Sequence, residues 1–191
     1  MERVVMPSVI LASGSPRRRE LLTMLGLDFE VVPSKAEELA PEGLSPEDTV
    51  MFLARTKGED VAGSVSCGKT VIAADTIVYL EGRIIGKPKD AEEAKEMLRM
   101  LSGKTHEVYT GVFVNGQCEY ERTSVTFREL TDDEIDGYIA TGEPLDKAGA
   151  YGAQGLGSVF VSRIEGDFFN VMGLPVCRLS NMLKAQGLRI F

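Results

Sequence analysis

A long run of apolar and β-branched residues, Thr70 to Leu80, limits the folds open to this chain more than any other feature. Its sequence, TVIAADTIVYL, is too apolar for a surface strand, so we expect a strand near the middle of a sheet. Asp75 interrupts the run. A carboxylate there is costly unless it is paired, hydrogen-bonded or bound to a metal, and functional sites tolerate such a cost. Asp75 is therefore either a functional carboxylate or a buried acid that satisfies a turn or a neighbouring arginine.

Helix-like and strand-like segments alternate along the rest of the chain, which is typical of an α/β fold. Asn115-Gly116 separates two strand-like segments and predicts a tight type I′ hairpin. No linker or repeat divides the sequence, so we expect a single domain over residues 1–191 with a mixed sheet. The predicted strands span residues 4–12, 29–32, 70–80, 84–85, 106–114, 117–127 and 159–164. The predicted helices begin after Ser15, Ser45, Asp90, Thr131 and Pro175.

The charge balance and residue usage exclude several classes of function. With 21 Lys and Arg against 29 Asp and Glu, the formal net charge of −8 disfavours broad electrostatic binding to nucleic acid or an anionic membrane. No stretch reaches the ~18 consecutive apolar residues of a membrane span, and no signal-peptide pattern begins the sequence. Three widely spaced cysteines and a single histidine offer neither a zinc pattern nor a disulfide framework. These features predict a cytoplasmic protein that binds any anion through a local cluster.

Residues 63–70, GSVSCGKT, match the phosphate-binding loop pattern G-x-x-x-x-G-K-[ST]. That loop binds phosphate when a strand precedes it and a helix follows, because backbone N–H groups and the helix N-terminus then converge. Here a predicted helix precedes the motif and the strand from Thr70 follows it. We therefore expect a connector, and a P-loop NTPase or kinase that uses Lys69 is the rival interpretation.

The segment Ser13-Gly14-Ser15-Pro16-Arg17-Arg18-Arg19 places three arginines in the first turn of a predicted helix. Cations at that end oppose the helix dipole. The arrangement is explained if an anion binds there, since free N–H groups, serine hydroxyls and guanidinium groups would all point at phosphate oxygens. The alternative is a solvated basic turn.

Several other residues are ambiguous when taken alone. Lys57 and Lys87 each resemble ordinary surface lysines, and His106 is expected to have a structural hydrogen-bonding role. Residues 149–157 are rich in glycine and either let the backbone approach a ligand closely or form a flexible loop, in which Gln154 offers a donor and an acceptor to a base edge. Taken together, cations and carboxylates without a histidine or cysteine nucleophile suit metal-assisted attack of water on a phosphoanhydride.

In combination these segments resemble the Maf family of nucleoside triphosphate pyrophosphatases. The resemblance covers nearly the whole chain, and its motifs are specific jointly rather than singly. They are Leu11-Ala12-Ser13-x-Ser15-Pro16-Arg17-Arg18, Ala74-Asp75-Thr76-Ile77-Val78, Lys87-Pro88, Leu101-Ser102-Gly103-x-Thr105-His106 and Asp146-Lys147-Ala148-Gly149-Ala150-Tyr151-Gly152-x-Gln154-Gly155.

The resemblance implies a fold like that of inosine triphosphate pyrophosphatases, with a mixed elongated sheet, flanking helices and two lobes around a cleft. It implies hydrolysis of a nucleoside triphosphate to the monophosphate and pyrophosphate with Mg²⁺ or Mn²⁺. By motif, Asp75 is implied to be the catalytic general base and a metal ligand, and Glu38 a second metal ligand. The residues implied to bind the triphosphate are Ser13, Arg17, Arg18, Lys57 and Lys87.

One branch of the family resembles dTTP/UTP pyrophosphatases and another prefers 7-methyl-GTP. The positions that separate the branches correspond to Arg17, Thr76 and Gln154, and all three match the dTTP/UTP branch. The resemblance leaves open the 7-methyl-GTP activity, a house-cleaning role toward modified nucleotides, and a non-enzymatic nucleotide-binding regulator of cell division. A homodimer is compatible with the sequence, although no motif requires one.

The sequence departs from the family pattern in three places. Lys35 and Ala36 stand where the family often has acidic or β-branched residues, which bears on the placement of Glu38. Ala153 replaces a larger aliphatic residue and would enlarge the base pocket. Arg19 adds a cation to which the resemblance assigns no role.

Overall fold

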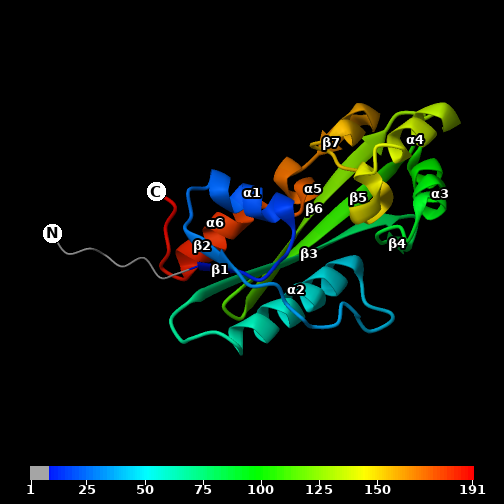
Figure 1. Ribbon diagram of the computed structural model, residues 1–191. Coiled ribbons are helices and arrows are strands. Elements are labelled where there is room, and N and C mark those ends of the chain that lie inside the picture. Colours follow the sequence, from blue (N-terminus) through cyan, green and yellow to red (C-terminus); the bar gives the residue numbers. More distant parts are fainter. Residues whose placement is uncertain (1–8) are drawn as a thin grey trace.

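The computed structural model describes residues 9–191, and within them one mixed sheet runs the length of the molecule (Figure 1). The strand order is β2-β1-β3-β5-β6-β7, and β4 pairs with β3 outside this path. β1 is parallel to β2 and β3, whereas the remaining pairs are antiparallel. The strands are β1 (Val9–Leu11), β2 (Phe29–Val31), β3 (Thr70–Leu80), β4 (Arg83–Ile85), β5 (Thr105–Val114), β6 (Gln117–Phe127) and β7 (Val161–Glu165).

Helices follow most of the strands, so the predicted α/β class with a mixed sheet and flanking helices is confirmed. The α-helices are α1 (Pro16–Met24), α2 (Pro46–Ala62), α3 (Ala91–Leu101), α4 (Asp132–Ile139), α5 (Phe168–Met172) and α6 (Val176–Ala185). Short 3₁₀ turns at Glu143–Asp146, Ala148–Ala150 and Leu156–Phe160 account for the glycine-rich segment that we expected to be irregular. Among residues 9–191, no helix combines the length and apolar character that a bilayer crossing requires.

Local sequence signals place most of these elements correctly. The central strand spans Thr70–Leu80 as predicted, and the hairpin turns at Asn115 and Gly116, whose φ angles of 44° and 90° are those of a type I′ turn. The first predicted strand, residues 4–12, is observed as Val9–Leu11, and residues 4–8 lie outside the described residues. The short helix α5 was not predicted.

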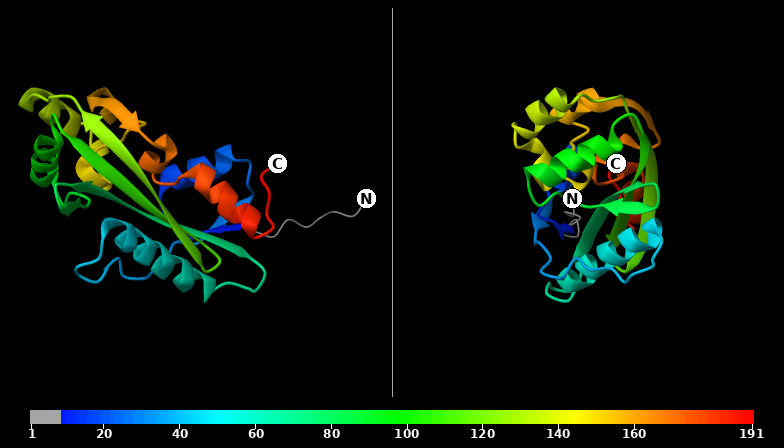
Figure 2. Two further views of the ribbon diagram at one scale, coloured as in Figure 1. Left: turned by 180° about the vertical axis from the view of Figure 1, so that it is seen from behind. Right: turned by 90° about the vertical axis from the view of Figure 1, so that its right-hand side faces the viewer.

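The two faces of β3 carry different layers of the fold. Val71 and Ala73 face α2 and pack with Ala54 and Val61 of that helix. On the opposite face, Ile72 and Ala74 pack against α1 and α6, whereas Val78 and Leu80 pack against α3 and α4. Figures 1 and 2 show α2 alone on one side of the sheet and the two helix groups at opposite ends of the other side. Thr76, the alternate residue between the two groups, therefore lies at the boundary between two lobes.

Two glycines let α2 approach the sheet closely. A Cβ atom on Gly58 of α2 would lie 2.0 Å from the ring of Phe113, and one on Gly111 of β5 would lie 2.2 Å from the carbonyl oxygen of Val50. Gly111 is the direct partner of Asp75 in the β3–β5 ladder, so the two residues share the α2 face. The absence of a side chain at Gly111 thus brings α2 alongside Asp75.

One edge of β3 is open in its middle. On the edge opposite β5, β1 pairs with residues 70–72 and β4 pairs with residues 78–80. Within the part of the chain that the structure describes, residues 73–77 have no strand partner on that edge. Asp75 stands in the middle of this gap, and side chains from both faces of β3 reach the space outside it.

Candidate active site

A cleft of about 660 Å³ opens beside the unpaired edge of β3. Its walls come from the β1–α1 loop, the loop between β2 and α2, the β4–α3 connection and the glycine-rich segment before β7. All of the residues for which the family resemblance implied a role line this one cleft: Ser13, Arg17, Arg18, Glu38, Lys57, Asp75, Thr76, Lys87 and Gln154. The basic segment near the start of the chain and the acid inside the central strand therefore meet around the same hollow.

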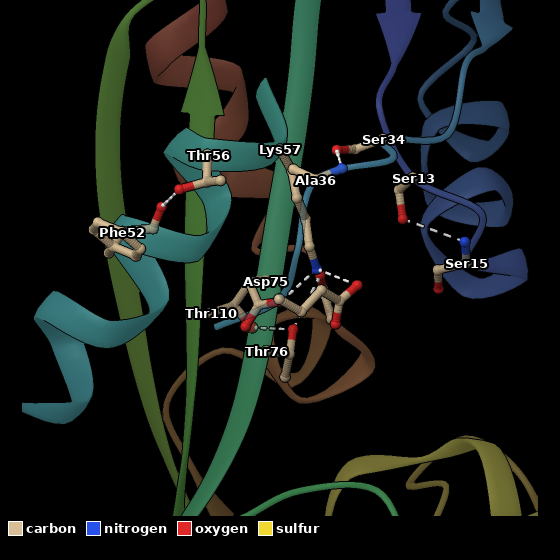
Figure 3. A network of polar contacts seen from close by, with 12 residues as sticks. Ser13, Ser15, Ser34, Ala36, Phe52, Thr56, Lys57, Asp75, Thr76 and Thr110 are labelled. Atoms are coloured by element: carbon tan, nitrogen blue, oxygen red, sulfur yellow. Dashed lines mark hydrogen bonds and ion pairs between the residues drawn. The ribbon is translucent and has the colours of Figure 1, made fainter. Parts of the chain in front are cut away.

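Lys57 joins two of the carboxylates that line the cleft, Asp75 and Glu38. Its Nζ lies 2.6 Å from Oδ1 of Asp75 and 3.0 Å from Oε1 of Glu38. The side chains of Lys57 and Asp75 are only 11% and 10% exposed, whereas that of Glu38 is 62% exposed. Figure 3 shows Lys57 reaching from α2 across to Asp75 on β3. Burial raises the pKa of Glu38, but the charge of Lys57 and its hydrogen bond outweigh this effect and lower it overall.

The two carboxylates fit a divalent cation that is shared with a phosphate substrate. No group of three or more His, Cys, Asp and Glu side chains gathers as a metal site within residues 9–191. Mg²⁺ does not need such a cage, because it is usually held by one or two carboxylates together with substrate phosphates and water. Asp75 and Glu38 both lie within ion-pair distance of one cationic group, the Lys57 ammonium. The two carboxylates are therefore close enough to bind the same cation.

Arg18 is buried, and its guanidinium is already engaged within the protein. Its Nε donates to the carbonyl oxygen of Gly173 at 2.8 Å, Nη1 donates to Oγ of Ser13 at 3.2 Å, and Nη2 donates to Oγ1 of Thr76 at 3.0 Å. Burial lowers the pKa of Arg18, and the charge of Asp75 opposes this shift. These bonds tie α1, β3 and the α5–α6 connection together, so Arg18 shapes the cleft wall as well as contributing charge to it.

A buried hydrogen-bond relay continues from Arg18 through Thr76. Oγ1 of Thr76 lies 2.9 Å from Oγ1 of Thr110, and the Thr110 hydroxyl donates to the carbonyl oxygen of Asn170 at 3.1 Å. Figure 3 shows the bond between the two threonine hydroxyls, in which either oxygen can be the donor. Thr76 thus accepts from Arg18 and shares a hydrogen bond with Thr110. Its orientation is fixed from both sides.

Sequence reasoning missed the far end of this relay. Thr110 is fully buried in β5 and could have been found as Asp75 was, since it is a polar residue in an apolar run. Asn170 is also fully buried, and its Nδ2 donates to the carbonyl oxygen of Val108 and to Oγ1 of Thr123. Asn170 lies in the short helix α5, where no periodic pattern marks a residue as buried.

Arg17 and Lys87 are more available to a ligand than Arg18. Arg17 faces the carboxylate of Asp146 only loosely, with Nη1 and Oδ2 3.8 Å apart. Lys87 is exposed on the β4–α3 connection, and within residues 9–191 it forms no ion pair. Pro16 begins α1 as predicted, but Ser15 makes no side-chain cap, and its backbone N–H donates instead to Oγ of Ser13 at 3.2 Å. The amino end of α1 therefore faces the cleft beside Arg17.

Gln154 lies on the cleft rim and is exposed. Its Nε2 donates to Oε2 of Glu20, 3.1 Å away on α1. The segment that carries Gln154 therefore lies against α1, and Arg17 of the same helix faces Asp146. Asp146 and Lys147 also line the cleft, so Gln154 adds an amide to a wall that carries charges of both signs.

The two remaining motifs lie outside the cleft chemistry. The P-loop-like segment leads from α2 directly into β3, and Lys69 pairs with Glu30 at 2.9 Å, so the helix that a phosphate loop requires after its glycines is a strand here. His106 is 1% exposed, and its Nε2 lies 2.7 Å from the hydroxyl of Tyr151. Burial lowers the pKa of His106 to about 4, so the ring is neutral near neutral pH.

Comparison with known sequences gives one consistent result. The profile of the family described as "Maf-like protein" matches residues 8–186. A dTTP/UTP pyrophosphatase of Bacillus cereus is 56% identical over 183 residues, which cover 94% of this chain and 90% of that protein. A dTTP/UTP pyrophosphatase of Bacillus cytotoxicus is 57% identical over 183 residues, 94% of this chain and 95% of that protein.

Solved structures resemble this chain more distantly. The Ham1 protein of Staphylococcus aureus matches with a TM-score of 0.43 and 19% identity, over 65% of this chain and 72% of that one. A nucleoside-triphosphatase/dITP/XTP pyrophosphatase of Mycobacterium abscessus matches with a TM-score of 0.39 and 18% identity, over 71% of this chain and 95% of that one.

Proposed function

The chain belongs to the Maf family, and from this premise we propose that it hydrolyses dTTP and UTP to the nucleoside monophosphate and pyrophosphate. The activity is that of relatives that share more than half of its residues over almost its whole length. The single observation that supports it most directly is the shared cleft, in which cationic side chains, the Asp75 and Glu38 carboxylates and the Gln154 amide meet around one hollow.

Asp75 is the proposed general base. It lies at the open edge of β3, is nearly buried and faces the cleft. An ionised carboxylate in this position accepts a proton from the attacking water as the water oxygen bonds to the α-phosphorus. The bond to the bridging oxygen then breaks, and pyrophosphate leaves with the electron pair of that bond.

Lys57 and Arg17 are the proposed ligands of the phosphate chain, with Lys87 and Ser13 beside them. Charge builds up on the phosphate oxygens and on the leaving pyrophosphate during the reaction, and cations fixed in a water-poor cleft stabilise that charge. Arg18 keeps its proposed place in the phosphate-binding wall, where its bonds to Ser13 and Thr76 also position neighbouring groups.

Asp75 and Glu38 are the proposed ligands of a divalent cation, Mg²⁺ or Mn²⁺. When bound, such a cation supplies a Lewis acid that neutralises phosphate charge. Glu38 is the more exposed of the two carboxylates, so it is free to adjust as substrate enters. Lys57 would then exchange its bonds to the carboxylates for bonds to phosphate oxygens.

The preference for a thymine or uracil base is proposed to involve Arg17, Thr76 and Gln154. Gln154 offers an amide to the edge of a base. The Thr76 hydroxyl is already bonded to Arg18 and Thr110, so Thr76 is proposed to affect base preference by positioning these neighbours rather than by bonding the base. Cytoplasmic location, homodimer formation and a single-domain organisation stay predictions.

The proposal is tested with purified protein and a panel of nucleoside triphosphates in the presence of Mg²⁺ or Mn²⁺. We expect dTTP and UTP to give monophosphate and pyrophosphate in equal amounts, with lower kcat/KM for purine nucleotides. Release of orthophosphate instead, or a preference for 7-methyl-GTP, would contradict the proposal. Absence of turnover with every nucleotide would favour the non-enzymatic regulator.

A further inference from the structure

Glu143 sits at the centre of a set of hydrogen bonds that the proposed chemistry does not use. Its Oε1 accepts from the hydroxyl of Tyr138 at 2.8 Å and from the backbone N–H of Gly157 at 3.1 Å. Its Oε2 accepts from the backbone N–H of Leu156 at 3.0 Å. The Tyr138 hydroxyl in turn accepts from the backbone N–H of Gly152 at 3.0 Å. The glycine-rich loop, residues 152–157, is therefore held at one end by the Glu143 carboxylate and at the other by the Tyr138 hydroxyl that is bonded to it.

The glycines of this loop are required by that closure. A Cβ atom on Gly155 would lie 2.6 Å from both carboxylate oxygens of Glu143. One on Gly152 would lie 2.9 Å from Cε of Lys147, and one on Gly157 would lie 2.7 Å from the Tyr138 hydroxyl. The sequence left open that these glycines let the backbone approach a ligand, and in the structure they approach groups of this chain: the Glu143 carboxylate at Gly155, the Lys147 side chain at Gly152 and the Tyr138 hydroxyl at Gly157.

The same loop forms part of the cleft wall. Gly152, Ala153 and Gln154 line the cleft, and Gln154 is its exposed amide. Gln154 lies between the two points at which the loop is held, Gly152 at the Tyr138 hydroxyl and Leu156 at the Glu143 carboxylate. The backbone on both sides of Gln154 is thus held through Tyr138 and Glu143, and its side chain is held in addition by Glu20 on α1.

We propose that Glu143, together with Tyr138, is a positioning residue for base selection, because it fixes the loop that presents Gln154 to the nucleotide base. This inference rests on the proposed pyrophosphatase function and deepens it. Glu143 does not line the cleft, and both of its carboxylate oxygens bond to the loop or to Tyr138.

A carboxylate suits this position better than an amide. Both Glu143 oxygens accept hydrogen bonds, so an amide nitrogen at either place would face an N–H or O–H donor. Burial raises the pKa of Glu143, but the backbone N–H groups of Leu156 and Gly157, with Tyr138 and Lys147, lower it overall and keep the group charged. Nζ of Lys147 also donates to the carbonyl oxygen of Glu143 at 2.7 Å.

The test is a double-mutant cycle between Glu143→Gln and Gln154→Ala. Steady-state kinetics with dTTP, UTP and dCTP give the kcat and KM of wild type, each single variant and the double variant. We expect Glu143→Gln to raise KM for dTTP about tenfold, to change kcat less than threefold and to reduce the preference for dTTP over dCTP. In the Gln154→Ala background, Glu143→Gln should change that preference less than twofold, because its effect passes through Gln154.

Control variants separate positioning from general stability. Glu96→Gln removes an exposed charge on α3 and should leave all parameters within twofold of wild type. Tyr138→Phe keeps the carboxylate but removes the hydroxyl that joins it to Gly152, and it should reproduce the loss of base preference if Glu143→Gln fails to fold. Loss of kcat/KM by the same factor for all three nucleotides, or an undiminished effect in the Gln154→Ala background, would overturn the inference.

Hydrogen exchange distinguishes failure of this inference from failure of the proposed function. The amides of Leu156 and Gly157 should exchange at least tenfold faster in Glu143→Gln than in wild type, whatever the substrate. If the wild-type protein has no pyrophosphatase activity but Glu143→Gln still exchanges these amides faster, the proposed function is refuted. The inference that Glu143 anchors the loop is then retained. Unchanged exchange would refute the positioning role even if dTTP is hydrolysed.

Discussion

The ammonium group of Lys57 lies 2.6 Å from a carboxylate oxygen of Asp75, and both side chains are nearly buried at the open edge of β3. A buried charge is tolerated when a partner compensates it, and here each residue compensates the other. Lys57 and Leu53 both bring α2 into the cleft wall, so the packing of one helix and the chemistry of the site are directly linked.

Replacement of Asp75 by Asn removes the proton acceptor while keeping the shape of the side chain. We expect kcat for dTTP to fall by about 10²–10⁴-fold, the usual contribution of general-base catalysis, with a modest change in nucleotide affinity. Pyrophosphate release and equilibrium binding of dTTP measure the two effects separately. Asp133→Asn, at an exposed acid of α4, is the matched control. Turnover of Asp75→Asn within a few-fold of wild type would rule out Asp75 as the general base.

Arg17 and Arg19 allow a matched comparison within one helical turn. Arg17 lines the cleft, whereas Arg19 is exposed and does not line it. Since a charge-assisted hydrogen bond is worth about 1.5–3 kcal/mol, Arg17→Ala should lower kcat/KM for dTTP roughly 10- to 150-fold. Arg19→Ala should change it less than twofold. Equal effects of the two substitutions would show that the basic segment acts only through its general charge.

The buried His106 leads to a prediction about how the free energy of unfolding depends on pH. Burial lowers its pKa to about 4, against 6.5 for the exposed side chain, so the unfolded chain binds the proton more readily than the native protein does. Above pH 6.5 the ring is neutral in both the folded and the unfolded state, so His106 does not change the free energy of unfolding. As the pH falls from 6.5 to about 4, the free energy of unfolding should decrease by up to ~3 kcal/mol. Urea unfolding of wild type and His106→Gln across this range measures the difference. The same slope in both proteins would contradict the assignment to His106.

Gly111 links the packing of α2 to the reaction. In Gly111→Ala the new methyl group would lie 2.2 Å from the Val50 carbonyl oxygen, so α2 has to shift away from β5. We expect a loss of about 1–3 kcal/mol in stability from overpacking, together with at least a tenfold loss of kcat because Lys57 moves relative to Asp75. The control is Gly137→Ala in α4, where no atom lies within 4 Å and stability should rise slightly. Full activity in a destabilised Gly111→Ala protein would show that the packing of α2 against Gly111 does not affect kcat.

Local patterns predicted the elements of this fold better than the contacts between them. β3 and the Asn115-Gly116 hairpin are specified by residues adjacent in sequence, and both were predicted correctly. Helix α5 was missed because it spans only Phe168–Met172, too short for a helical period, although Asp167 caps its amino end. A single acid within an apolar strand is enough to identify Asp75 as a candidate from the sequence alone.

The candidate site was predicted as a set of residues, but their partners were not. Arg18 was expected to face phosphate, and no local signal shows that its guanidinium also binds the carbonyl of Gly173. The glycines near Gln154 were noticed, but the Glu143 carboxylate that Gly155 approaches was not, and only the folded loop brings the two together. Contacts of this kind depend on tertiary geometry, which propensity and periodicity do not encode.

The bond between Arg18 and Gly173 spans 155 residues of sequence. During translation, a growing polypeptide that has not yet emerged beyond α5 has no such carbonyl to offer, so the guanidinium lacks one of its three partners and the wall of the cleft is incomplete. Ribosome-bound intermediates and early-terminated products should therefore be inert rather than partly functional. The enzyme would gain its activity only in the last stretch of its synthesis.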